Sequence, residues 1–256
     1  MSSPRMEIGE FLTVQEALAR AGRHDDPRCP FCLPPEFYPR QLLLATPHFY
    51  VLAAGGQIVE GFVCIVTHEH RDEPKRLRCI ADVEPGALDE LVLLQSLISE
   101  FYADAYAAPP LFYENGRGGG TADRHPSAGF EFHPHLCALP GQYDLHGPLA
   151  RAYESRTLTS LGDIRKDLGT VPYLYVHSSA DPQYPDPTVY VARTAEGERE
   201  IVSASLRDVL ALHNERCRSR DWHVEPGLDD LNATIANFDR WYSGTFIEAA
   251  TRDRFW

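Results

Sequence analysis

Residues that can bind metal or attack phosphorus gather in four short stretches between residues 29 and 135. The stretches are Cys29-Pro30-Phe31-Cys32, Thr67-His68-Glu69-His70, Glu114-Asn115-Gly116 and His133-Pro134-His135. A Cys-x-x-Cys pair offers two thiolates to zinc, and a tetrahedral zinc site then needs two further ligands from elsewhere in the fold. Histidines that end one strand or lie in another can supply those ligands.

The His-Pro-His stretch has the spacing of two side chains on one face of a strand. Alternate residues of a strand share a face, so His133 and His135 project from the same side if Pro134 keeps the chain extended. One imidazole could then bind metal or orient its neighbour, while the other attacks phosphorus as a neutral ring. Glycines, among them Gly116 and Gly129, would let backbone N–H groups approach phosphate oxygens closely.

The elements that must position these residues are predicted from hydrophobic spacing. Apolar residues at helical intervals predict a long helix over residues 84–107, which the prolines at 109 and 110 stop. Two β-rich runs, 48–53 and 61–67, predict a hairpin around a glycine-containing turn. Further elements are predicted at 7–23, 205–212 and 228–241 (helices) and at 111–115, 130–139, 171–179 and 188–194 (strands). Strands around one long helix indicate an α+β fold.

The order of the motifs resembles that of a known family. CPFC, VCIVTHEH closing a strand, ENG, a glycine-rich stretch and HPH together resemble the histidine-triad superfamily. Within it, HPH with an upstream Cys-x-x-Cys is most similar to the galactose-1-phosphate uridylyltransferase and dinucleoside-tetraphosphate phosphorylase branch. The resemblance covers residues 27–140, about half of the chain. It implies a histidine-triad-like (HIT-like) antiparallel sheet with a long helix packed on it, plus a C-terminal α/β extension.

The resemblance also implies a division of the chain and roles for its residues. It implies a HIT-like nucleotide-binding catalytic domain over 1–145 and an extension over 146–256 that completes the fold or the pocket. His135 would become covalently nucleotidylylated, so that the reaction proceeds in two displacements, and Asn115 would help to position the phosphate. The implied ligands of a structural zinc ion are Cys29, Cys32, His70 and His133. His68 is the competing choice for the position given to His70.

Cys137 departs from the family pattern. That pattern has His or Gln two residues after the nucleophile, to hydrogen-bond the phosphoryl or leaving group, and this chain has Cys137 there. We place Cys137 in the catalytic group with His135 and Asn115, although a thiol is a weak donor. A nucleotide-binding module of the same fold without turnover is therefore a second hypothesis.

Other interpretations of the same residues stay open at this point. Two His-x-His pairs on strands can also build an open catalytic metal site, here from His68, His70, His133 and His135. Cys29 and Cys32 could instead be small buried hydrophobes, and Asn115 could cap a turn. The remaining cysteines are interpreted as packing residues: Cys64, Cys79 and Cys217.

Composition and charge exclude several classes of partner. The 256 residues are 43% hydrophobic, which suffices for a full core. A net charge of -13 and a pI near 5.2 would repel nucleic acid, so we expect a small-molecule nucleotide or nucleotide conjugate in a local pocket. The chain has no apolar run of about 18 residues and no secretory signal, so we expect no membrane partner and a cytoplasmic location. The family resemblance implies a homodimer.

Overall fold

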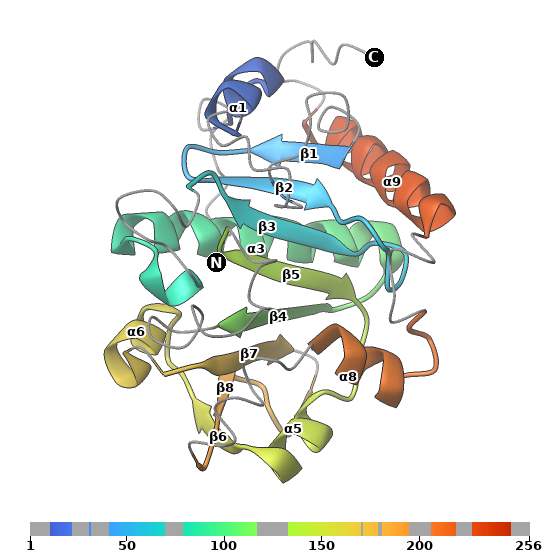
Figure 1. Cartoon of the computed structure of the whole chain (residues 1–256). Coiled ribbons are helices and arrows are strands. Elements are labelled where there is room, and N and C mark those ends of the chain that lie inside the picture. Colours follow the sequence, from blue (N-terminus) through green and yellow to red (C-terminus); the bar gives the residue numbers. More distant parts are fainter. Residues whose placement is uncertain are drawn as a thin grey trace.

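The described part of the chain folds around a sheet of eight antiparallel strands. The computed structural model describes residues 11–21, 31, 41–69, 79–116, 133–169, 171–178, 181–194, 206–218 and 227–246. Within these ranges the strands lie in the order β1-β2-β3-β5-β4-β7-β8-β6, and every neighbouring pair is antiparallel (Figure 1). The α+β class and the antiparallel sheet predicted from the sequence are confirmed.

The predicted N-terminal hairpin is present at one end of the sheet. β2 (Phe49–Ala53) pairs with β3 (Val63–Thr67), and every residue of both strands is buried. Strands covered on both faces consist of continuous apolar runs rather than alternating ones. β1 (Leu42–Ala45) pairs with the other edge of β2 and was not predicted, because its sequence LLLA gives no alternation.

The long helix predicted from apolar spacing is α3 (Pro85–Tyr106). It begins with Pro85 in its first turn, where the missing N–H of proline costs no hydrogen bond. It ends at Ala107, whose φ of 48° places it in the left-handed region that commonly terminates helices. The predicted bounds of 84–107 are therefore confirmed to within one residue at each end.

The second half of the chain continues the same sheet. β4 (Pro110–Gly116) pairs with β5 (His135–Pro140) on one side and with β7 (Tyr173–Ser178) on the other. β8 (Thr188–Val191) and the edge strand β6 (Glu154–Thr157) follow. β6 was not predicted, because all four of its residues are exposed and polar or charged.

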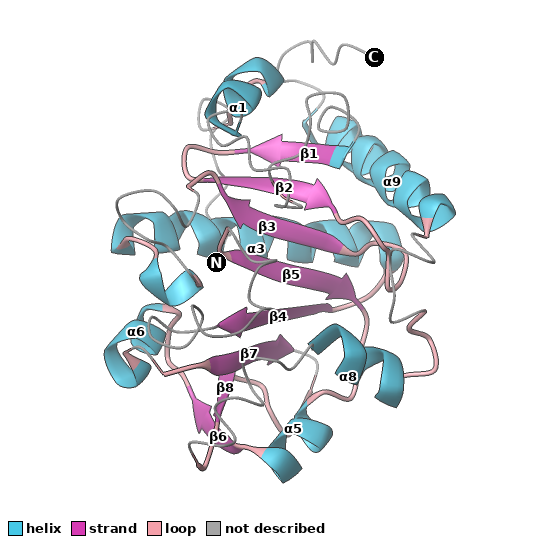
Figure 2. Cartoon of the chain, in the orientation of Figure 1, coloured by secondary structure: helices cyan, strands magenta, loops and turns pink. Residues whose placement is uncertain are grey.

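Helices cover both faces of the sheet (Figure 2). The remaining ones are α1 (Val14–Ala21), η2 (Ile80–Asp82), α5 (His146–Ala152), α6 (Gly162–Leu168), α8 (Leu206–His213) and α9 (Leu228–Phe246). α3 and α9 pack on one face in a core that contains Phe112 and Leu136. α1, α5 and α8 pack on the other face in a core that contains Tyr113 and Cys137. Adjacent residues of β4 and β5 thus enter opposite cores, as the pleat of a strand requires.

A buried polar contact joins residues from the two predicted domains. The backbone N–H of Gly61 donates to the Thr234 hydroxyl of α9 at 2.7 Å, and this hydroxyl lies 3.0 Å from Gln57 Oε1. The division at residue 145 stays a prediction. The two segments nevertheless share one sheet and this contact.

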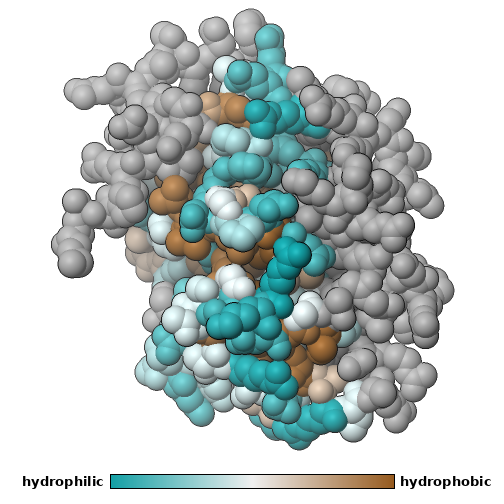
Figure 3. Space-filling view, turned by 90° about the vertical axis from the view of Figure 1, so that its left-hand side faces the viewer, coloured by the Kyte–Doolittle hydropathy of each residue, from teal (hydrophilic) through white to brown (hydrophobic). Residues whose placement is uncertain are grey.

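Within the described ranges, every helix is too short or too polar to cross a bilayer. On the side of the molecule drawn in Figure 3, hydrophilic and hydrophobic residues are interspersed over the described surface. Among the described residues, the large hydrophobic side chains that are exposed belong to separate segments: Val92, Val171, Leu212 and Leu228.

Candidate functional site

The three residues predicted to be catalytic lie at the β4–β5 pair. His135 and Cys137 are two residues apart in β5 and therefore share a face of the sheet. Tyr113 of β4 pairs with Cys137, and Asn115 lies two residues further along β4, on the same face as Tyr113. The register thus brings His135, Asn115 and Cys137 to one face, while their catalytic roles stay predictions.

A backbone carbonyl fixes the ring of His135. Its Nδ1 lies 3.0 Å from the carbonyl oxygen of His133. A carbonyl oxygen only accepts hydrogen bonds, so Nδ1 carries the proton and Nε2 carries the lone pair. The side chain is half-buried, at the first residue of β5. This is the tautomer in which Nε2 of a neutral imidazole can act as a nucleophile.

His133 is held in the same manner but is almost fully buried. It is 2% exposed, and its Nδ1 donates to the carbonyl oxygen of Thr67 at 2.8 Å, at the end of β3. The N–H of Thr67 donates in turn to the carbonyl oxygen of Pro134 at 3.0 Å. Metal-binding histidines commonly donate their second N–H to such a carbonyl, which orients the other nitrogen toward the metal. The contact therefore fits the ligand role that the resemblance implies.

Phe31, from the middle of the Cys-x-x-Cys stretch, packs against both histidines. Its ring centroid lies 4.6 Å from that of His135 and 6.3 Å from that of His133. Its carbonyl oxygen accepts a hydrogen bond from the Tyr50 hydroxyl at 3.2 Å. The predicted site residues that lie outside the described ranges are Cys29, Cys32, His70 and Gly129. The one described residue of that stretch is thus in contact with the HPH motif.

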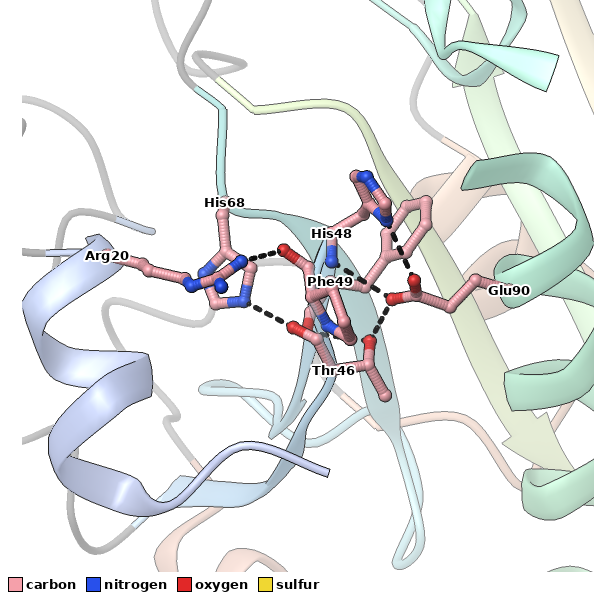
Figure 4. Close-up of polar contacts among 7 residues, drawn as sticks. Arg20, Thr46, His48, Phe49, His68 and Glu90 are labelled. Carbon is pink, nitrogen blue, oxygen red and sulfur yellow. Dashed lines mark hydrogen bonds and ion pairs between the residues drawn. The ribbon is translucent and has the colours of Figure 1, made fainter. Parts of the chain in front are cut away.

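His68 lies beside this cluster with one buried ring nitrogen that lacks a hydrogen-bond partner. Its Nε2 donates to the carbonyl oxygen of Thr46 at 3.0 Å, whereas Nδ1 has no partner among the described residues (Figure 4). Its ring centroid is 5.3 Å from that of Tyr50, which is 6.4 Å from that of His133. Burial lowers the pKa of His68 to about 4, so the ring is neutral near pH 7 and Nδ1 bears a lone pair.

A network from three elements fixes the turn between β1 and β2 behind His68. Glu90 of α3 accepts a hydrogen bond from the backbone N–H of His48 at 3.0 Å, and its second oxygen lies 2.8 Å from His48 Nδ1. The Thr46 hydroxyl donates to the same carboxylate, and Arg20 of α1 donates to a carbonyl of the turn (Figure 4). The network holds the Thr46 carbonyl at the place where His68 Nε2 meets it.

The side chains proposed as metal ligands can be compared with those that zinc prefers. Among the residues that the structure describes, no group of three or more His, Cys, Asp or Glu side chains is placed to hold a metal. The described residues contribute two imidazoles, His133 and His68, each fixed through one nitrogen by a backbone carbonyl. Two such imidazoles and the two thiols of the Cys-x-x-Cys stretch would make a tetrahedral zinc site of ordinary composition.

Cys64 is a neighbour of the site that sequence reasoning missed. It pairs directly with Cys137 across β3 and β5, and the two Sγ atoms are 3.5 Å apart. The contact with Cys64, and then those with His135 and Tyr113, lower the pKa of the Cys137 thiol below its ordinary value. The sequence interpretation of Cys64 as a packing residue missed this, because the strand register that joins residues 73 positions apart is not visible in a local pattern.

Gly116 has a packing reason for being glycine. A Cβ atom on Gly116 would lie 2.0 Å from Cζ of the Tyr173 ring, so only glycine lets this ring cover the strand. The Tyr173 hydroxyl donates to the buried carboxylate of Glu114 at 2.8 Å, and the same carboxylate accepts the Ile80 N–H at 2.7 Å. The predicted approach of Gly116 to a phosphate stays a prediction beside this observed role.

Comparison with family models and curated proteins adds no assignment to this geometry. No family model matches the chain, and no curated protein matches it significantly. The site therefore has to be interpreted from its own residues.

Proposed function

We propose that this chain is a HIT-like enzyme that transfers or hydrolyses a nucleotidyl group through a covalent nucleotidyl-histidine on His135. The observation that carries the proposal is the contact between His135 Nδ1 and the carbonyl oxygen of His133, 3.0 Å apart. It assigns the lone pair to Nε2 in a half-buried ring on the face that Asn115 and Cys137 share. A histidine that only fills space in the core would not need a hydrogen bond that orients its ring.

The chemistry follows from the assigned tautomer. Nε2 of His135 attacks the α-phosphorus of a nucleotide, a bond forms between nitrogen and phosphorus, and the bond from phosphorus to the leaving-group oxygen breaks with its electron pair. The ring becomes cationic as this happens, and its Nδ1–H bond to the His133 carbonyl becomes charge-assisted and stronger. Water or a phosphate-bearing acceptor then attacks the phosphorus and releases the neutral ring.

Asn115 is the proposed positioning residue for the phosphoryl group. Its place in β4, two residues beyond the Tyr113 that pairs with Cys137, puts a neutral amide on the face that His135 shares. An amide N–H can donate to a phosphoryl oxygen as negative charge shifts during displacement, without attracting the proton of the histidine. The net charge of -13 favours a single nucleotide held in a local site over a long polyanion.

We also propose a structural zinc ion held by Cys29, Cys32 and His133, with His70 or His68 as the fourth ligand. When bound, it would brace the HPH stretch against the end of β3, which the His133–Thr67 hydrogen bond already joins. The partnerless Nδ1 of His68 favours this residue over the choice made from the sequence. Zinc content of the purified chain separates the two: His68→Gln lowers it if His68 is the ligand, and His70→Gln lowers it otherwise.

A nucleotide-binding module without turnover is the second candidate. The observation that favours it is the Cys137 sulfur, which lies 3.5 Å from that of Cys64 where the family has a polar side chain facing the phosphate. The module would bind nucleotides through the same face and catalyse nothing.

A turnover assay on the full chain tests the proposal. Nucleoside diphosphate conjugates and dinucleoside polyphosphates are supplied with and without phosphate as acceptor, and nucleotide binding is measured in parallel. We expect turnover by the wild-type chain, none by His135→Ala, and unchanged turnover by His213→Ala, whose side chain is exposed on α8. Binding without turnover in the wild-type chain would favour the module.

A further inference from the structure

Cys64 and Cys137 form a pair of thiols in contact across two neighbouring strands. They are directly opposite in the β3–β5 register, and their sulfur atoms are 3.5 Å apart. A disulfide bond is about 2.05 Å long, so a movement of roughly 1.5 Å would close it. Of the four described cysteines, which are all free thiols, this pair is the one in sulfur–sulfur contact.

The surroundings make the two sulfurs chemically unequal. The contact with Cys64, and then those with His135 and Tyr113, lower the pKa of Cys137. The same contact, together with burial, raises the pKa of Cys64. Cys137 therefore gives up its proton first, and the thiolate is the form of cysteine that reacts with oxidants.

We propose that Cys64 and Cys137 are a redox-reactive dithiol, which a hydroperoxide oxidises to a disulfide between β3 and β5. The Cys137 thiolate attacks one peroxide oxygen, the O–O bond breaks, and Cys137 becomes a sulfenic acid as the second oxygen leaves and takes up a proton. The Cys64 sulfur then attacks the Cys137 sulfur, the S–S bond forms, and the hydroxyl group leaves as water with the Cys64 proton. Two thiols and one hydroperoxide thus give one disulfide, one water and one further water or alcohol.

The disulfide has a consequence for the candidate site. It commits the Cys137 sulfur to Cys64, so that the thiol that interacts with the His135 side chain is lost. We expect oxidation to alter turnover for this reason. This consequence rests on the proposed function, whereas formation of the disulfide does not.

Peptide mapping of the full-length chain tests the proposal. The folded protein is treated with hydrogen peroxide, remaining thiols are alkylated, and the chain is digested with trypsin. Cys64 and Cys137 fall on the separate tryptic peptides 41–71 and 125–151, whereas Cys29 and Cys32 share the peptide 29–40. We expect the first two peptides to be cross-linked, with loss of two hydrogen atoms, and to be separated again by dithiothreitol.

Variants assign the order of the steps. In Cys64→Ala we expect no cross-link and an accumulation of Cys137 sulfenic acid, trapped with dimedone, because the resolving thiol is gone. In Cys137→Ala we expect Cys64 to stay reduced. Cys79→Ala is the matched control, since this buried thiol is in another part of the core, and it should cross-link like the wild-type chain.

Two results would overturn the proposal: absence of the cross-linked peptide in folded wild-type protein, or a cross-link that forms only after unfolding in urea. Both outcomes are measured on the wild-type chain, so the proposal can be refuted even if an alanine variant fails to fold. A cross-link without any change in turnover would refute the effect on the site and leave the dithiol in place. Absence of turnover before oxidation would count against the proposed function alone.

Discussion

The Nδ1 atom of His133 lies 2.8 Å from the carbonyl oxygen of Thr67, so a histidine ring that is 2% exposed ties the HPH stretch to the end of β3. The contact fixes the tautomer of His133. It also places the carbonyl oxygen of His133 where His135 Nδ1 meets it. The histidine proposed as nucleophile is thus oriented by the backbone of the histidine proposed as ligand.

Replacing His133 with alanine should destabilise the chain. The substitution leaves the Thr67 carbonyl unsatisfied in a buried place, which costs about 1–3 kcal/mol, before any loss of metal is counted. Urea unfolding checks this, with His213→Ala as the exposed control, for which the change should stay within about 0.5 kcal/mol. Equal stabilities of the two variants would contradict the structural role of His133.

Replacing Gly116 with alanine should destabilise the chain in the absence of any nucleotide. The new methyl group would meet the Tyr173 ring, and overpacking of this kind costs about 1–3 kcal/mol. Gly55→Ala is the matched control, because nothing lies within 4 Å of a Cβ built there. Thermal unfolding of both variants without ligand separates the packing role from a phosphate role. A Gly116→Ala protein as stable as Gly55→Ala would refute the packing role.

The stability of the chain should fall in mild acid because of His146. Its side chain is 2% exposed, with Nδ1 2.6 Å from the Tyr190 hydroxyl, and burial lowers its pKa. The unfolded chain has a histidine pKa of about 6.5 and binds the proton that the folded state resists, so this stability is complete above about pH 6.5 and is lost as the pH falls toward the folded pKa.

Urea unfolding at about pH 7.5 and about pH 5.5 checks the pH dependence. We expect His146→Gln to show a shallower fall in the free energy of unfolding between these values than the wild-type chain. His213→Gln, at an exposed position on α8, should keep the wild-type slope. A wild-type slope in His146→Gln would show that this histidine does not contribute.

Replacing Thr234 with valine should weaken the attachment of α9 to the hairpin of β2 and β3. Valine has the shape of threonine but leaves the buried Gly61 N–H without its acceptor, which costs about 1–3 kcal/mol. The exposed Thr157 of β6 provides the control substitution Thr157→Val. Hydrogen exchange at the Gly61 amide reports the effect locally, and exchange at the wild-type rate in Thr234→Val would contradict it.

Local patterns predicted the elements whose periodicity is strong. α3 and the β2–β3 hairpin follow directly from apolar spacing and a glycine-containing turn. β6 could not be predicted, since its four residues are exposed and it exists only because β8 offers an edge to pair with. Tertiary pairing overrides local composition at such an edge strand.

The residues of the candidate site also fall into those that a local sequence pattern marks and those that it does not. The HPH motif marked His133 and His135 from residue type and spacing alone. The contact of Cys64 with Cys137 could not be predicted, and His68 could be named only as an alternative to His70, because these relations depend on strand pairing and on which ring nitrogen meets a backbone carbonyl. Such relations arise from long-range register, which a single sequence does not encode locally.

The most direct test of the central claim is the mass of the tryptic peptide 125–151 after incubation with a nucleotide donor and quenching in base, where a phosphorus–nitrogen bond survives. We expect a fraction of this peptide to gain one nucleoside monophosphate, with fragmentation placing it on His135, and His135→Ala to show none. An adduct on any other residue, or turnover that persists in a folded His135→Ala chain, would contradict the account.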